Sequence, residues 1–112
     1  PPEPLGQKAV DIAMGKLGAP YIWGDKGPNT FDCSGLTGWV WRQLGVPLGP
    51  DTYTQIKQGK RVSDVMPGDL IFPYIGHVQL AVSKNEVIEA PGRGMVVRLH
   101  PMPPSFTAIR VA

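Results

Sequence analysis

The sequence is poor in cysteine, in histidine and in clustered charge. Its 112 residues include one cysteine, Cys33, and two histidines, His77 and His100. A single cysteine excludes an internal disulfide and says little about the compartment. No apolar run reaches the roughly 18 residues of a membrane span. The 11 lysines and arginines are scattered, with only Lys60 and Arg61 adjacent, so the sequence offers no basic cluster for nucleic acid.

Turn-forming residues are abundant, with 14 glycines and 13 prolines, which predicts many turns and short elements. Hydrophobic residues make up 42% of the chain, as in a globular protein, and the length suits one small domain. The opening Pro1-Pro2-Glu3-Pro4 resembles the end of a proline-rich linker and lacks the pattern of a signal peptide. We therefore expect residues 1–4 to be a linker remnant. Residues 5–112 should form a single monomeric domain that belongs to a longer multidomain protein.

Helical patterns come first along the chain and strand patterns follow. Apolar spacing and helix-stop residues predict helices at residues 7–17 and 33–44 and a short third helix from a cap at Asp51 to about residue 58. Strands are expected at residues 70–72 (ended by Pro73), 77–82, 87–90, 95–99 and 106–111. This order predicts an α+β fold with the helices packed on an antiparallel sheet of about five to six strands.

The second helix begins at the only cysteine. Asp32 is a good N-cap residue, which places Cys33 in the first turn, where the partial positive charge of the helix end favours a thiolate. Cys33, Leu36, Val40 and Leu44 fall on one helical face, so the sulfur should point toward the rest of the fold. Two interpretations follow: a reactive thiol, or a small buried hydrophobic residue.

A thiolate nucleophile needs a base, and the base needs a third group that fixes its tautomer. His77 is the preferred base because it begins an apolar strand of the sheet that the second helix covers. His100, at the start of a proline-rich loop, is expected on the surface. If the strands pair across a turn at 83–86, residue 80 lies opposite Glu89, which brings this carboxylate near His77. Glu89 could instead point to solvent.

Five motifs in the same order resemble the NlpC/P60 family, the papain-like bacterial peptidoglycan endopeptidases. They are Tyr21-Ile22-Trp23-Gly24, Phe31-Asp32-Cys33-Ser34-Gly35-Leu36, Pro67-Gly68-Asp69-Leu70-Ile71-Phe72, Gly76-His77-Val78 and Ile88-Glu89-Ala90-Pro91. The resemblance covers the chain from Leu5 onward. It implies a papain-like fold with Cys33 as nucleophile, His77 as general base and Glu89 as third member, without a metal or cofactor.

The same resemblance implies a substrate cleft and an oxyanion hole. Backbone N–H groups at the helix start, including that of Cys33, would stabilise the oxyanion. The residues matching the cleft are Tyr21, Trp23, Asp32, Ser34 and Gly76. The implied reaction is hydrolysis of the stem peptide of bacterial peptidoglycan between D-glutamate or D-isoglutamine and meso-diaminopimelate. The implied location is extracellular, on the cell wall or in a phage particle.

The chain also departs from the common family pattern. Asp25 stands where a second glycine is frequent, and Gln79 stands where a small residue is common. Glu89 occupies a position that is often histidine, which resembles the actinobacterial branch of the family and phage-borne wall hydrolases.

Three other functions compete with the endopeptidase. A papain-like N-acetylmuramoyl-L-alanine amidase would use the same order of cysteine, histidine and acid. A module that only binds wall peptides would not need a thiol facing an imidazole. A zinc site built from Cys33, His77 and His100 would have an acceptable ligand number, but these three residues include no closely spaced pair.

Overall fold

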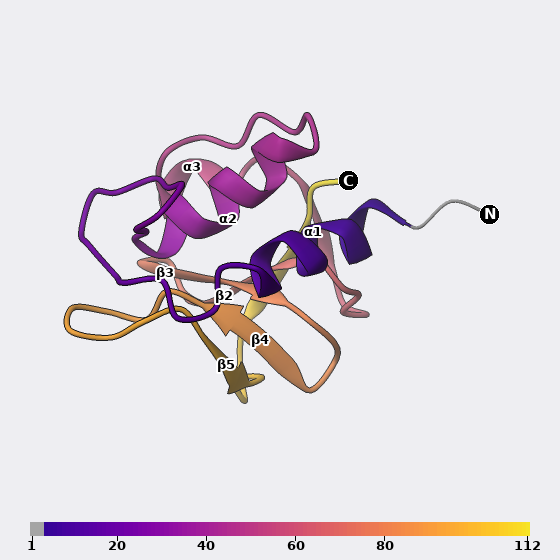
Figure 1. The fold of residues 1–112 in the computed structure, drawn as a ribbon. Coiled ribbons are helices and arrows are strands. Elements are labelled where there is room, and N and C mark those ends of the chain that lie inside the picture. The colour runs from indigo at the N-terminus through magenta and orange to yellow at the C-terminus, as the bar shows by residue number, and fades with distance from the viewer. Residues whose placement is uncertain (1–3) are drawn as a thin grey trace.

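A computed structural model describes residues 4–112, so the predicted linker remnant lies outside the described residues except for Pro4. The predicted α+β fold is confirmed: helices pack against a six-stranded antiparallel sheet of order β1-β6-β2-β3-β4-β5. Figure 1 shows α1 and α2 together on one side of the sheet. The elements are α1 Leu5–Met14, α2 Cys33–Gln43, α3 Thr52–Gln55, β1 Lys60–Val62, β2 Leu70–Tyr74, β3 His77–Ala81, β4 Glu86–Glu89, β5 Arg98–Pro101 and β6 Thr107–Arg110.

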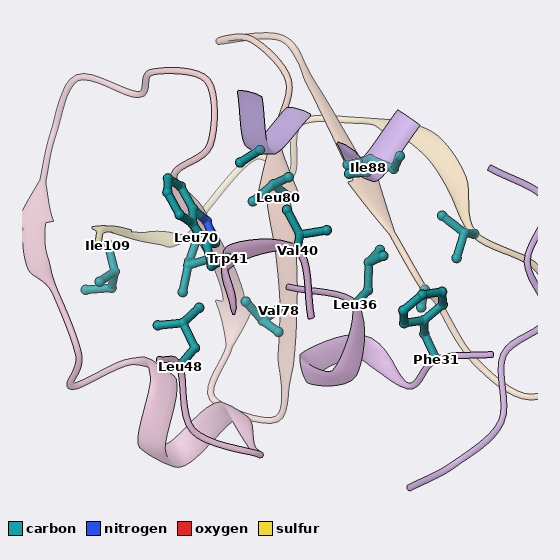
Figure 2. Packing of buried hydrophobic residues seen from close by; sticks show 14 of the residues in the cluster. Phe31, Leu36, Val40, Trp41, Leu48, Leu70, Val78, Leu80, Ile88 and Ile109 are labelled. Carbon is teal, nitrogen blue, oxygen red and sulfur yellow. The ribbon is translucent and has the colours of Figure 1, made fainter. Parts of the chain in front are cut away.

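The main core lies between the helices and the sheet. Leu36 and Val40 on α2 are buried, as the predicted helical face required, and they lie close to Val78 and Leu80 of β3 (Figure 2). Successive strand residues point to opposite faces of a sheet. Ala81 accordingly belongs to a second, smaller cluster with Ile71, Val87 and Ala108. The sheet is therefore buried on both faces near its centre.

One predicted strand end was wrong for a clear physical reason. Pro73 does not end β2, which continues to Tyr74, the partner of His77. The register shifts between Ile71 and Tyr74, and a proline without an N–H is tolerated at such a bulge. The register shift brings Tyr74 opposite His77, the first residue of β3.

Other boundaries also differ from the predictions. The first helix ends at Met14 and turns follow it, and α3 ends at Gln55. The predicted strand at 95–99 is displaced to Arg98–Pro101. The strand β1 was not predicted, because Lys60-Arg61-Val62 is largely exposed and has no apolar alternation.

The register of β3 and β4 differs by one residue from the predicted one. Leu80 lies opposite Ile88 and not opposite Glu89. Glu89 instead lies directly opposite Arg98 of β5. Among the described residues, no helix has the length and apolar character needed to cross a bilayer.

Candidate active site

The start of α2 holds Cys33 in a well-defined position. Asp32 is extended and caps the helix, with Oδ1 accepting a hydrogen bond from the Gly35 N–H at 2.6 Å. Its Oδ2 accepts from the Gly24 N–H at 3.1 Å and from Lys26 Nζ at 2.8 Å. The predicted N-cap is confirmed. The same buried carboxylate also ties the preceding loop to the helix, so that Cys33 is anchored from two sides.

The two residues after Cys33, Ser34 and Gly35, also have structural roles. A Cβ on Gly35 would lie 2.2 Å from the carbonyl oxygen of Asp25, so only glycine lets the loop pack this closely on the first turn of the helix. Ser34 donates its hydroxyl to the carbonyl of Pro50 at 3.1 Å. Ser34 and Gly35 therefore hold the backbone at the start of the helix in place, and with it the sulfur of Cys33.

Two backbone donors remain available beside the sulfur. Within residues 4–112, neither the N–H of Cys33 nor that of Ser34 has a hydrogen-bond acceptor, as expected for the first turn of a helix. Such donors, together with the helix dipole, can stabilise negative charge that develops on a substrate oxygen.

His77 lies between the sulfur and a carboxylate. Its side chain is only 13% exposed, and Nε2 lies 2.7 Å from Oε1 of Glu89. The Tyr74 ring stacks beside the imidazole, with 6.1 Å between ring centroids. Burial lowers the pKa of His77, but hydrogen bonds with Cys33 and Glu89 and the charges of both groups outweigh this effect and raise the pKa to about 9. The arrangement favours an imidazolium facing the thiol.

Glu89 is buried in the sheet with a 3% exposed side chain. Besides His77, Gln79 Nε2 donates to Oε1 at 2.8 Å, and Arg98 Nε donates to Oε2 at 3.0 Å. Burial raises the pKa of Glu89, but the hydrogen bonds from His77, Gln79 and Arg98 lower it to about 2. Glu89 is therefore an ionised carboxylate, and the alternative in which it points to solvent is excluded.

A cleft of about 400 Å³ opens at Cys33. All five residues expected to bind substrate line it together with the cysteine: Tyr21, Trp23, Asp32, Ser34 and Gly76. Trp23 is 73% exposed. Burial, followed by the charges of Cys33 and Asp32, raises the pKa of Tyr21. His77 and Glu89 support the site without lining this cleft.

The sequence matches the NlpC/P60 family over residues 18–109. The chain belongs to this family. A probable endopeptidase of Corynebacterium glutamicum is 38% identical over 116 residues, a match that covers 98% of this chain and 56% of that protein. The domain therefore belongs to a class of cysteine peptidases that hydrolyse peptidoglycan, and this relative fits the expected actinobacterial branch.

Solved NlpC/P60 structures have the same fold. The NlpC/p60 domain of the peptidoglycan hydrolase SagA is 32% identical with a TM-score of 0.84, covering 94% of this chain and 97% of that one. NlpC2 of Trichomonas vaginalis is 29% identical with a TM-score of 0.90, covering 99% of this chain and 48% of that one. The chain thus spans about half the length of the Corynebacterium relative and of the Trichomonas structure.

Sequence reasoning missed several residues of this NlpC/P60 site. Gln79 was treated only as a departure from the family pattern, although its position two residues after His77 puts both on one face of β3. Arg98 could not be placed without the pairing of β4 and β5. The other side of the cleft comes from the loop before α3 and from α3 itself: Pro50, Asp51, Thr52 and Tyr53.

His100 takes no part in the site. It is exposed on β5, opposite Val87, with Nδ1 3.0 Å from the carbonyl oxygen of Pro101. Within the described part of the chain, no three histidine, cysteine or acidic side chains lie close enough together to hold a metal ion. The zinc interpretation therefore has no support in this arrangement.

Proposed function

We propose that this NlpC/P60 domain is an endopeptidase that cleaves the stem peptides of bacterial peptidoglycan. The bond is the amide between D-glutamate or D-isoglutamine and meso-diaminopimelate. The observation that carries the proposal is the proximity of three groups: Cys33 lines the cleft, His77 lies beside Cys33, and ionised Glu89 accepts a hydrogen bond from His77. The domain acts outside the membrane, on the wall or from a phage particle, and it acts as a monomer.

The proposed reaction begins with the Cys33 thiolate attacking the carbonyl carbon of the scissile amide. A C–S bond forms, and the C=O electron pair moves to oxygen, where the N–H groups of Cys33 and Ser34 stabilise the charge. When the intermediate collapses, the C–N bond breaks and the leaving amine takes the proton from the His77 imidazolium. Neutral His77 then removes a proton from water, which hydrolyses the thioester, releases a carboxylate and restores the thiolate–imidazolium pair.

Digestion of purified diaminopimelate-type peptidoglycan, followed by mass spectrometry of the soluble fragments, tests the proposal. We expect fragments with a new amino terminus on diaminopimelate and none from Cys33→Ala. His77→Ala should lose nearly all activity, whereas His100→Ala, which removes the exposed histidine, should retain it.

Other outcomes would contradict the proposal in distinguishable ways. Release of whole stem peptides that begin with L-alanine would identify the amidase. Binding to peptidoglycan without cleavage by the wild-type protein would identify a binding module. Equal cleavage by wild type and Cys33→Ala would exclude the thiol mechanism.

A further inference from the structure

We propose that Gln79 and Arg98 are positioning residues that hold Glu89 in the orientation required by His77. This inference rests on the proposed thiol mechanism. These two side chains keep the proton of the neutral imidazole on Nε2, so that Nδ1 is free to accept the proton of the Cys33 thiol.

The donors around Glu89 are divided between its two oxygens. Oε1 accepts from His77 Nε2 at 2.7 Å and from Gln79 Nε2 at 2.8 Å. Oε2 accepts from Arg98 Nε at 3.0 Å, and Arg98 Nη2 lies 2.9 Å from the same oxygen. A carboxylate offers about four acceptor positions, and three hydrogen bonds and one ion-pair contact engage both oxygens. Glu89 therefore cannot rotate without losing several of these contacts.

The role of Arg98 follows from the burial of Glu89. Arg98 lies directly opposite Glu89 on the edge strand β5, and its guanidinium stabilises the ionised form. A neutral Glu89 would carry an O–H donor and could present it to His77 Nε2. The imidazole proton would then sit on Nδ1, which is the nitrogen that must accept the proton of the thiol. Ionised Glu89 excludes this tautomer because it can only accept.

Gln79 has an energetic cost that packing does not explain. It is 4% exposed, and its Oε1 has no hydrogen-bond partner within residues 4–112. A buried acceptor left without a donor is unfavourable, because it loses its hydrogen bonds to water on folding. Turning the amide over would aim Oε1 at the negative oxygen of Glu89. The orientation that leaves Oε1 without a partner is therefore the one that holds Glu89, which indicates a functional role.

The charged and titratable groups around the imidazole come from three elements. Cys33 faces His77 from α2 and Glu89 faces it from β4, and the Tyr74 ring stacks on it from β2. Arg98 reaches the imidazole only through Glu89. Removing Arg98 or Gln79 should therefore act on His77 through the carboxylate alone.

The test uses four single variants of the intact domain. Gln79→Met removes the amide and keeps the length of the side chain. Arg98→Met removes the guanidinium, and Arg98→Lys keeps the charge. Arg61→Met is the matched control, because Arg61 is an exposed arginine on β1, at the opposite edge of the sheet. Each is assayed for kcat and KM on peptidoglycan fragments, and the ring nitrogens of His77 are observed by 15N NMR above pH 9.

We expect Gln79→Met and Arg98→Met to lower kcat about tenfold or more with little change in KM, by analogy with the partners that orient metal-ligating histidines. The neutral imidazole should shift from Nε2–H toward a mixture of tautomers. Arg98→Lys should restore the Nε2–H form and bring kcat to within about threefold of wild type. Both guanidinium nitrogens of Arg98 contact the same oxygen of Glu89, so a single ammonium group can supply the positive charge there without bidentate geometry. Arg61→Met should match wild type.

Wild-type kcat in both methionine variants would overturn the proposal. A lower kcat with an unchanged His77 tautomer would also overturn it. If Arg98→Met does not fold, Gln79→Met decides, because it leaves the ion pair between Arg98 and Glu89 in place. The NMR readout does not depend on turnover. If the wild-type protein shows no endopeptidase activity, the proposed function is refuted, and the tautomer of His77 still tests the role of Gln79 and Arg98.

Discussion

Two buried carboxylates of the same sheet are each paired with an arginine, but their other partners differ. Asp69, beside β2, receives both guanidinium contacts on separate oxygens, Arg110 Nε on Oδ1 at 3.0 Å and Nη2 on Oδ2 at 2.9 Å. In the second pair, the two guanidinium nitrogens of Arg98 share a single oxygen of Glu89. The side chains of both carboxylates are 3% exposed.

The remaining donors explain this difference. Oδ2 of Asp69 also accepts from the backbone N–H of Met66 at 2.8 Å, and Arg110 Nη2 continues to the carbonyl of Asp64 at 2.7 Å. This pair closes the turn that leads into β2 and joins it to β6. Glu89 instead keeps Oε1 for two side chains, His77 and Gln79. A carboxylate–arginine pair thus holds the backbone of a turn at Asp69 and orients an imidazole at Glu89.

Replacing each carboxylate by its amide gives the sharpest test of this comparison. Asp69→Asn and Glu89→Gln should each reduce the free energy of unfolding by about 1.5–3 kcal/mol, because each weakens hydrogen bonds to a charged group. Only Glu89→Gln should also lower kcat, by roughly 10²- to 10⁴-fold, since it replaces the charged, acceptor-only carboxylate that orients the general base by a neutral amide that can also donate. Its loss should remain smaller than that of Cys33→Ala.

Urea denaturation and peptidoglycan turnover, both at a temperature where the two variants stay folded, provide the measurement. Comparable losses of kcat in folded Asp69→Asn and Glu89→Gln would remove the distinction between the two pairs. The same conclusion would follow if neither variant lost activity.

The pH dependence of stability is the second way to separate the pairs. The pKa of His77 rises from 6.5 to about 9 against the opposing effect of burial. The contribution of protonated His77 to the free energy of unfolding is therefore complete below about pH 6.5 and is lost as the pH rises through 9. The pKa of Glu89 falls from 4.5 to about 2, again against burial. The contribution of ionised Glu89 to the free energy of unfolding is complete above about pH 4.5 and is lost as the pH falls toward 2.

The difference in unfolding free energy between wild type and His77→Ala should therefore be largest between about pH 4.5 and 6.5 and shrink on both sides. Urea unfolding at about pH 3, 5.5 and 9.5 measures it, with His100→Ala as the matched control. A difference that stays constant across this range would show that the pair does not hold its charges in the folded state.

The helix side of the site could be predicted from the sequence because its geometry is local. Asp32 caps α2 three residues before Gly35, and the spacing of Leu36 and Val40 predicts the buried face. Such features depend on neighbours within one or two turns. The same holds for the order of helices and strands, which was sufficient for the α+β fold.

The sheet side could be predicted only in outline because it depends on register. A bulge at Pro73 and a one-residue difference in the pairing of β3 and β4 decide which side chains meet. The partner of Glu89 across the sheet, Arg98, follows a loop that carries no pairing signal. The nearness of Glu89 to His77 was predicted, but the contacts of this carboxylate with Gln79 and Arg98 were not.

A third buried carboxylate, Asp32, gives the smallest expected effect. Its cation, Lys26, has a 35% exposed side chain and contacts Oδ2 at 2.8 Å. Unlike Asp69 and Glu89, Asp32 also accepts from two backbone N–H groups, those of Gly24 and Gly35. Lys26→Met should therefore cost only about 0.5–1 kcal/mol of unfolding free energy, as expected for a partly exposed ion pair, and the cost should decrease with added salt.

Urea denaturation of Lys26→Met at low and high salt measures this effect, and Lys60→Met, an exposed lysine on β1, is the matched control. A loss as large as that of Asp69→Asn would mean that a buried carboxylate of this fold needs its cation even when backbone donors are in place. A small loss would mean that the donors at the helix start suffice. Cys33 would then keep its position without help from the lysine, whereas His77 depends on side chains that reach it across the sheet.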